Sequence, residues 1–177
     1  MLPKLITFDL DYTLWDLWID THVTEPIRRS GDAVVDAHGQ VIEFYPDVSS
    51  ILRRLRDQDV ILAACSRTHA PKLARQALQL LRVSANELES GDSVEQSAIE
   101  VFDSLQNYPG SKLAHFRALH AKTGVPYEQM LFFDDESRNR EVENLGVVFH
   151  LTPTGIDNAT FDAGVKAWVT RISKSAY

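Results

Sequence analysis

The sequence predicts an α/β fold in which a mostly parallel sheet is covered by helices on both faces. Short apolar, β-rich segments alternate along the chain with segments of helical periodicity, which is the pattern of repeated βαβ units. Three of the apolar segments end in residues that can carry chemistry, at Asp9, at Ser66 and at Asp134 with Asp135. Because open α/β sheets bind ligands at the carboxyl ends of their strands, these two observations favour a Rossmann-like three-layer sandwich.

The first half of the chain is predicted to contain two strands and two helices. Residues 4–9 form an apolar run rich in β-branched and aromatic residues. A helix should begin after the N-cap residue Asp47, since the apolar positions that follow have helical spacing: Val48, Ile51, Leu52 and Leu55. Residues 60–65 are typical of a buried strand, and residues 71–82 of the helix that follows it.

The second half continues the alternation. Ser111 is the predicted cap of a helix that ends at Gly124 and turns Leu113, Phe116 and Leu119 inward. Residues 130–133 and 147–151 are predicted strands, and residues 136–144 a short helix between them. A last helix places five apolar residues on one stripe: Phe161, Val165, Trp168, Val169 and Ile172.

Two segments are irregular. In residues 15–45, polar turns separate β-like runs at residues 33–35 and 40–45, which predicts a small β-hairpin insertion. Residues 84–107 are polar, with a break at Gly91-Asp92-Ser93, and their role stays open. With no repeat and no long linker, the 177 residues should form one domain, residues 1–177.

The composition narrows the class of protein. A net charge of −7 argues against nucleic acid or an anionic membrane as a partner, and no apolar run approaches the length of a membrane span. The acidic motif at Asp9 leaves no secretory signal pattern at the amino terminus. A single cysteine, Cys65, excludes an internal disulfide and fits a reducing compartment. We expect a soluble monomer of the cytoplasm, with the nucleus left open.

The segment Asp9-Leu10-Asp11-Tyr12-Thr13-Leu14 concentrates the chemistry of the chain. If it continues the strand, Asp9 and Asp11 share one face, because successive strand residues point to opposite faces. Two close carboxylates repel each other unless a cation lies between them or one of them holds a proton. The motif therefore suggests a magnesium site that carries an aspartate nucleophile.

This motif resembles the first motif of the haloacid dehalogenase (HAD) superfamily of phosphotransferases. Further blocks, in the same order, resemble the small eukaryotic magnesium-dependent phosphatases of that superfamily: Trp18-x-Asp20-Thr21-His22-Val23, Ser66-Arg67-Thr68, Tyr108-Pro109-Gly110-Ser111-Lys112, Lys122-Thr123-Gly124-Val125-Pro126 and Phe132-Phe133-Asp134-Asp135-Glu136. The resemblance implies an HAD-like fold with a small insertion, no large cap domain, and Mg²⁺ as cofactor.

The resemblance also implies a role for each acidic residue. Asp9 would be the nucleophile that forms an aspartyl-phosphate, with a plain magnesium ligand as the alternative. Asp11 would be the general acid–base and would also reach the metal with its backbone carbonyl. Asp134 and Asp135 complete the expected metal site; we favour Asp135 as the direct ligand, with Asp134 behind it.

The expected contacts with the substrate or its phosphate are Leu10, Trp18, Ser66, Arg67 and Lys112. From the residues alone, Ser66 is a helix N-cap and Lys112 an ordinary lysine, and only the resemblance reverses this. Arg67 is equally compatible with a clamp on a phosphate or carboxylate and with a solvated surface position. Trp18 is equally compatible with packing. The Mg²⁺ site and these residues together predict a phosphoric monoester hydrolase.

Its expected substrates are aryl phosphates, phosphotyrosine, or phosphorylated sugars and glycated amines, either as small molecules or on a phosphoprotein. The alternatives are a narrow sugar-phosphate phosphatase and a catalytically silent HAD binding module; the latter is disfavoured because every expected catalytic position is filled. Residues 15–45 are too few for a separate lid domain. The site should therefore open to solvent, with the hairpin, Trp18 and Arg67 at its rim.

Overall fold

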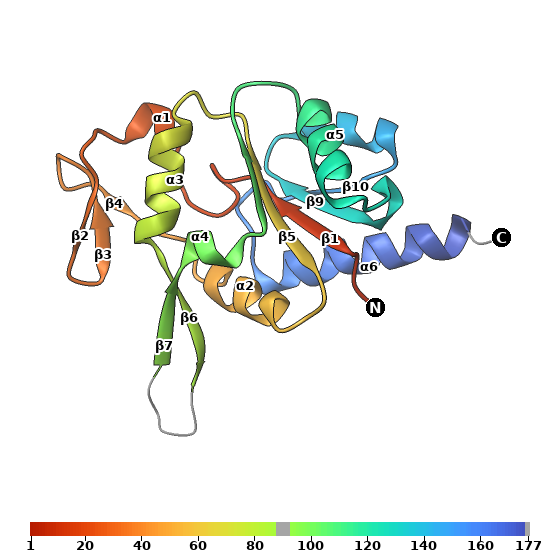
Figure 1. Cartoon of the computed structure of the whole chain (residues 1–177), viewed down its shortest axis with the longest axis horizontal. Helices are drawn as coiled ribbons and strands as arrows, with labels where there is room; N and C mark the ends of the chain where they lie inside the picture. The colour runs from red at the N-terminus through yellow and green to blue at the C-terminus, as the bar shows by residue number, and fades with distance from the viewer. Residues whose placement is uncertain (88–92, 176–177) are drawn as a thin grey trace.

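A computed structural model describes residues 1–87 and 93–175 of the chain. Its centre is a five-stranded sheet in the order β10-β9-β1-β5-β8 (Figure 1), and every neighbouring pair in it is parallel. The strands are β1 (Leu5–Phe8), β5 (Ile61–Ser66), β8 (Ser104–Asn107), β9 (Met130–Asp134) and β10 (Val148–Leu151). The predicted α/β class and the parallel sheet are confirmed.

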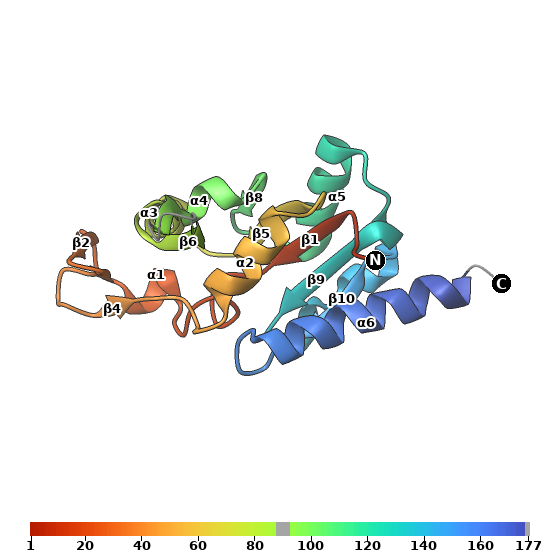
Figure 2. The same ribbon diagram turned by 90° about the horizontal axis from the view of Figure 1, so that it is seen from below.

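Helices cover both faces of this sheet. The helix α5 (Lys112–Thr123) and the 3₁₀ helix η2 (Ser137–Leu145) pack on one face, while α2 (Val48–Arg56), α3 (Pro71–Leu80) and α6 (Asn158–Ser175) pack on the other. Figure 2 shows α5 and α6 on opposite sides of the sheet. The short elements are α1 (Ile19–His22), α4 (Ala98–Val101) and η1 (Tyr127–Gln129).

Alternate residues of β1, β5, β9 and β10 enter two separate apolar clusters. Ile6 and Phe8 pack towards α2 and α6, whereas Leu5 packs with Phe116 of α5. All four residues of β1 are buried. A strand buried on both faces reads as a continuous apolar run rather than an alternating one, which is why the sequence revealed β1, β5 and β9.

Residues 84–107 contain more regular structure than the sequence suggested. The strands β6 (Arg82–Glu87) and β7 (Ser93–Ser97) form an antiparallel hairpin, followed by α4 and the edge strand β8. The hairpin projects from the end of α3 (Figure 1). Of the predicted break, Gly91 and Asp92 lie outside the described residues, and Ser93 begins β7. β8 escaped prediction because its polar residues pair with only one neighbouring strand.

The predicted hairpin insertion is a three-stranded antiparallel sheet of β2 (Arg28–Ser30), β3 (Ala33–Val35) and β4 (Val41–Ile42). Its last turn is shaped by the buried Asp36, whose carboxylate accepts backbone N–H groups of Thr24, His38 and Gln40 at 2.8–3.0 Å. Asx geometry of this kind replaces backbone pairing in a turn.

Of the local predictions, two need correction. Asp47 precedes α2 but does not cap it with its side chain; instead its Oδ2 accepts the N–H of Asn158 at the start of α6, at 2.9 Å. The short helix predicted over residues 136–144 is confirmed, as the 3₁₀ helix η2. In α5, Ser111 and Gly124 act as predicted, but Leu113 is only half-buried.

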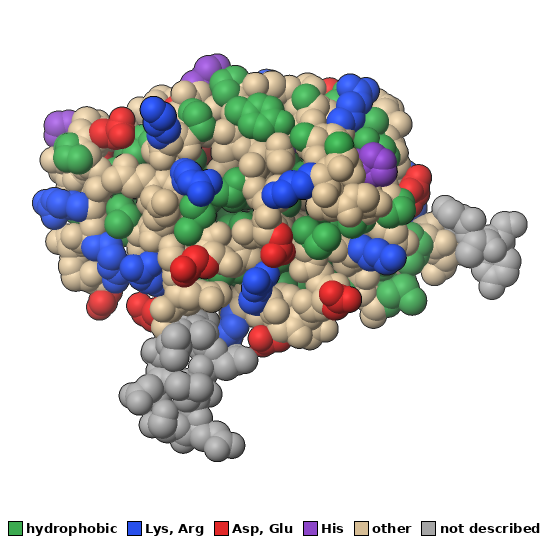
Figure 3. Space-filling model, in the orientation of Figure 1, with side chains coloured by type: hydrophobic (Ala, Val, Ile, Leu, Met, Phe, Trp, Pro, Cys, Tyr) green, Lys and Arg blue, Asp and Glu red, His purple; other side chains and the backbone are tan. Residues whose placement is uncertain are grey.

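The surface shows no segregation of charge on the face in Figure 3, where basic and acidic side chains of the described residues are interspersed. Among residues 1–87 and 93–175, none of the helices combines the length and the apolar character that a membrane crossing requires.

Candidate active site

The carboxyl ends of three neighbouring strands bring the predicted chemistry together. In the register of the sheet, Phe8 of β1 lies beside Phe133 of β9 and Ala64 of β5. The N–H of Asp9 continues this ladder by donating to the carbonyl of Phe133 at 2.9 Å. Asp9 is thereby fixed next to Asp134, and both lie near Ser66 at the end of β5.

These strand ends open into a cavity of about 360 Å³. Of the predicted site residues, Asp9, Asp11, Trp18, Ser66, Arg67, Lys112 and Asp135 line it. Asp134 lies behind the wall, fully buried. Leu10 does not line the cavity: its side chain is buried in the core, so only its backbone could serve a substrate.

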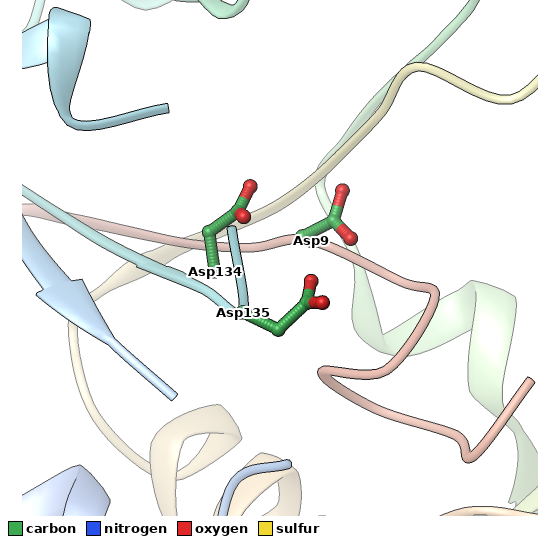
Figure 4. Close-up of side chains that lie close together, drawn as sticks. All are labelled: Asp9, Asp134 and Asp135. Atoms are coloured by element: carbon green, nitrogen blue, oxygen red, sulfur yellow. The ribbon is translucent and has the colours of Figure 1, made fainter. Parts of the chain in front are cut away.

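Three carboxylates converge beside this cavity. Asp9, Asp134 and Asp135 each offer an oxygen, and these oxygens lie within 4.8 Å of one another. Figure 4 shows the three carboxylates grouped at the ends of β1 and β9. Both oxygens of Asp134 lie within hydrogen-bond distance of the donor Asn139 Nδ2 (3.0 and 2.8 Å), and Oδ1 also accepts the N–H of Glu136 (2.7 Å). Its oxygens are therefore already engaged, while Asp135 faces the cavity.

Lys112 supplies the positive charge of the cluster. It is the first residue of α5 and only 1% exposed, and its ammonium group lies 2.5 Å from Asp9 Oδ1, 2.5 Å from the carbonyl oxygen of Cys65 and 3.2 Å from Asp134 Oδ2. A cation in the first turn of a helix opposes the helix dipole. The two aspartates offset that cost, so the position of Lys112 serves the site rather than the helix.

The charges of this cluster are unbalanced, since three carboxylates face one ammonium group. Burial raises the pKa of Asp9, and Lys112 only partly opposes this. Burial also raises the pKa of Asp135 to about 6, with the charge of Asp134 adding to the shift. For Lys112, burial would lower the pKa, but Asp9 and Asp134 outweigh it and raise the pKa. A divalent cation would correct the imbalance.

Asp11 lines the same cavity but not by continuing the strand. β1 ends at Phe8, and the chain turns so that the N–H groups of Thr13 and Leu14 donate to the carbonyl of Leu10. The Asp11 carboxylate accepts the indole N–H of Trp15 at 2.6 Å and the N–H of Ile19 at 3.1 Å. The carboxylate lies outside the three-carboxylate group, and whether the carbonyl reaches a metal stays a prediction.

The environment of Asp11 suits proton transfer. Burial raises the pKa of its carboxyl to about 6, against the lowering by the two hydrogen bonds from Trp15 and Ile19. A carboxyl group with a pKa near the working pH can both give and take a proton. Asp11 therefore has the properties expected of a general acid–base.

The turn after β5 presents the predicted phosphate contacts. Ser66 Oγ accepts the N–H of Thr68 at 3.2 Å, which leaves its own hydroxyl proton free for an oxygen in the cavity. Arg67 Nη1 donates to Asn139 Oδ1 at 3.2 Å, so Arg67 is tied through Asn139 to Asp134. The arginine is thus held at the cavity rather than free in solvent.

The rim of the cavity differs from the prediction in one respect. Trp18 is 47% exposed and packs edge-on against Tyr12 and stacked on His22. Trp15, in contrast, is fully buried. Trp18 and Arg67 line the cavity as predicted, but no residue of β2, β3 or β4 does.

Sequence reasoning missed several residues that line the cavity. Asn139, 1% exposed, bridges Asp134 and Arg67, and Asp20 and Thr68 line the cavity in contact with each other. Asp20 and Thr68 stand within the motif blocks, which was the available signal. Asn139 had none, because its position depends on the 3₁₀ path of η2.

Comparison with known proteins agrees with this geometry. Residues 1–171 match the model of the acid phosphatase family. An HAD-like hydrolase superfamily protein of Schizosaccharomyces pombe is 51% identical over 150 residues, which cover 83% of this chain and 84% of that protein. Magnesium-dependent phosphatase 1 of Homo sapiens is 41% identical over 169 residues, covering 94% of this chain and 88% of that protein.

Solved structures support the fold. An HAD family enzyme of Bacteroides thetaiotaomicron, a magnesium complex, has a TM-score of 0.58 at 14% identity, over 92% of this chain and 99% of that one. A 3-deoxy-D-manno-octulosonate 8-phosphate phosphatase of Moraxella catarrhalis has a TM-score of 0.55 at 17% identity, over 97% and 92%. The chain therefore belongs to the acid phosphatase family of the HAD superfamily, and its enzyme class is that of the phosphoric monoester hydrolases.

Proposed function

We propose that this chain is a magnesium-dependent phosphomonoester phosphatase that forms an aspartyl-phosphate on Asp9. The observation that carries the proposal is the convergence of three carboxylates and the buried ammonium group of Lys112 beside one open cavity. The name of the human relative, magnesium-dependent phosphatase 1, supports the choice of metal.

The residues present fit a magnesium ion. Mg²⁺ is bound in phosphoryl-transfer sites by one or two carboxylates, with water and phosphate oxygens completing its shell. Asp9 and Asp135 would hold it, with Asp134, already bonded to Asn139 and Lys112, orienting the site from behind. When bound, the ion would neutralise carboxylate charge and that of the phosphoryl oxygens.

The side chains divide the remaining work. Asp9 attacks phosphorus, and the bond to the leaving oxygen breaks while Asp11 gives that oxygen a proton. Asp11 then takes a proton from the water that hydrolyses the aspartyl-phosphate. Ser66 and Arg67 hold phosphoryl oxygens, and Lys112 offsets the repulsion between the phosphate and Asp9.

The shape of the cavity bears on the substrate. The chain between β1 and β5 builds α1, the small sheet β2–β4 and α2, and neither that sheet nor α2 contributes a residue to the cavity. We infer an open site, in one domain without a lid, that accepts a phosphate on a bulky group. Aryl phosphates, phosphotyrosine, and phosphorylated sugars and glycated amines all meet this condition, and the Trp18 ring could pack against their organic part.

A hydrolysis screen tests the proposal. Aryl phosphates, phosphopeptides, sugar phosphates and glycated-amine phosphates would be compared with Mg²⁺ and with excess chelator. We expect hydrolysis in several classes with Mg²⁺ and none with chelator. Activity on a single sugar phosphate would show a narrow phosphatase in place of the broad substrate range. No hydrolysis of any substrate class would contradict the proposed phosphatase activity.

A further inference from the structure

Asp20 lines the cavity without a role in the proposed reaction. It lies on α1, and its side chain is 22% exposed. A carboxylate on the wall of a phosphate site weakens phosphate binding by repulsion. We therefore expect Asp20 to make a favourable contact that offsets this repulsion.

That contact is with the turn that follows β5. Asp20 Oδ2 accepts the N–H of His69 at 3.0 Å and the hydroxyl of Thr68 at 3.4 Å, across 49 and 48 residues of sequence. The other oxygen, Oδ1, accepts the hydroxyl of the adjacent Thr21 at 3.0 Å. The two oxygens thus divide into one that joins two segments and one that is local.

The turn depends on side chains for its backbone order. It connects Ser66 with Pro71, and α3 begins without a side-chain cap at its N-cap residue. Thr68 Oγ1 accepts the N–H of Ala70 at 3.0 Å while its proton goes to Asp20. Thr68, 4% exposed, also donates its own N–H to Ser66 Oγ at 3.2 Å.

A continuous chain of hydrogen bonds therefore runs from Asp20 through Thr68 to Ser66. We propose that Asp20 is a positioning residue, which fixes the turn so that Ser66 and Arg67 meet the phosphoryl oxygens. The inference rests on the proposed phosphatase function. Asp20 acts as a hydrogen-bond acceptor, not as a charge that contacts the substrate.

The geometry separates these two roles. In Asp20→Asn, the amide oxygen can occupy the place of Oδ2 and accept from both His69 and Thr68, while the amide nitrogen donates to Thr21. Asp20→Ala removes both contacts. A positioning residue is rescued by Asn, whereas a carboxylate that contacts a cationic part of the substrate is not.

The test uses the full chain with Mg²⁺ and measures kcat and KM for p-nitrophenyl phosphate, together with the Kd of inorganic phosphate by calorimetry. Asp20→Ala should raise KM and Kd by about tenfold, since one or two hydrogen bonds that order the turn are lost, and change kcat much less. Asp20→Asn should recover most of this loss. Thr21→Ala, which touches only the local oxygen, is the matched control and should behave as wild type.

Thr68 provides an independent arm. Thr68→Val should raise KM and Kd as Asp20→Ala does, Thr68→Ser should recover them, and the double variant should show less than the sum of the two effects. This arm decides the question if Asp20→Ala does not fold. The inference would be overturned if Asp20→Asn were as impaired as Asp20→Ala. It would also be overturned if KM and Kd were unchanged in both Asp20→Ala and Thr68→Val. A wild-type chain that binds phosphate but hydrolyses no monoester would instead contradict the proposed function, and the Kd values would still test Asp20.

Discussion

The ammonium group of Lys112 lies 2.5 Å from Oδ1 of Asp9, although 103 residues separate them in sequence. The contact joins the first turn of α5 to the end of β1 and extends to Asp134 at 3.2 Å. One lysine thus holds two carboxylates that would otherwise repel each other. A fixed cation at this point also permits an anionic nucleophile to approach an anionic phosphate.

Replacing this lysine should therefore impair catalysis. Lys112→Met keeps the apolar stem and removes the charge, and it should lower kcat/KM for an aryl phosphate by about 10²–10³-fold, as for loss of one electrostatic stabiliser. Lys122→Met is the control, because Lys122 lies on the same helix but bonds Asp103 and Ser104 instead. Wild-type kinetics in Lys112→Met would contradict the role of the ammonium group.

The two neighbouring aspartates should respond differently. Asp135→Asn should raise the Mg²⁺ concentration that gives half-maximal activity by at least about tenfold, since a ligand is lost. Asp134→Asn breaks buried contacts with Lys112 and Asn139, and it should lower the free energy of unfolding without metal by about 3 kcal/mol. A magnesium titration and urea unfolding of both variants test the assignment, and the opposite pattern would exchange the two roles.

Asp11 should matter most for poor leaving groups. Asp11→Asn cannot donate a proton, so it should slow hydrolysis of an alkyl phosphate by about 10²–10⁴-fold. A nitrophenolate leaves without help, and its release should be slowed much less. Comparison of the two substrates in single-turnover experiments measures this, and equal slowing would argue against a general acid.

The buried His115 should make stability depend on pH. Burial, with the charge of Lys112, lowers the pKa of His115 to about 4. Between the ordinary pKa of about 6.5 and pH 4, the unfolded chain binds a proton that the folded chain does not, so stability falls as the pH falls through this window.

His115→Gln should remove this pH-dependent part of the stability, because glutamine does not titrate. The glutamine amide can still donate to the carbonyl of Tyr108, which the His115 Nε2 contacts at 3.0 Å. From pH 7 to pH 4, the wild type should lose on the order of 2 kcal/mol more unfolding free energy than the variant. Urea unfolding at several pH values measures the difference. Parallel curves for the two proteins would show that His115 does not titrate in this way.

The sequence predicted those parts of the fold that are buried on both faces. β1, β5 and β9 are continuous apolar runs, and the residues that end them were predicted to carry the chemistry. The hairpin β6–β7 and the edge strand β8 were not predicted, because a strand that pairs with only one neighbouring strand can be polar. Asp47 was recognised as a capping residue, but a sequence does not tell which helix it caps.

In the candidate site, too, some residues could be predicted from the sequence and others could not. Residues at strand ends, such as Asp9 and Asp135, were predictable because parallel strands bring their carboxyl ends to one edge. Asn139 and the contact between Asp20 and Thr68 depend on how a 3₁₀ segment and α1 fold back on the sheet. Such long-range polar contacts leave no periodic signal in the sequence.

The central claim is that Asp9 becomes phosphorylated. Asp11→Asn, quenched in acid within one turnover of p-nitrophenyl phosphate and Mg²⁺, should carry one phosphoryl group on the peptide that contains Asp9, as located by mass spectrometry. The double variant with Asp9→Asn should carry none. A phosphoryl group on any other side chain, or product formation at the wild-type rate by Asp9→Asn, would contradict the account.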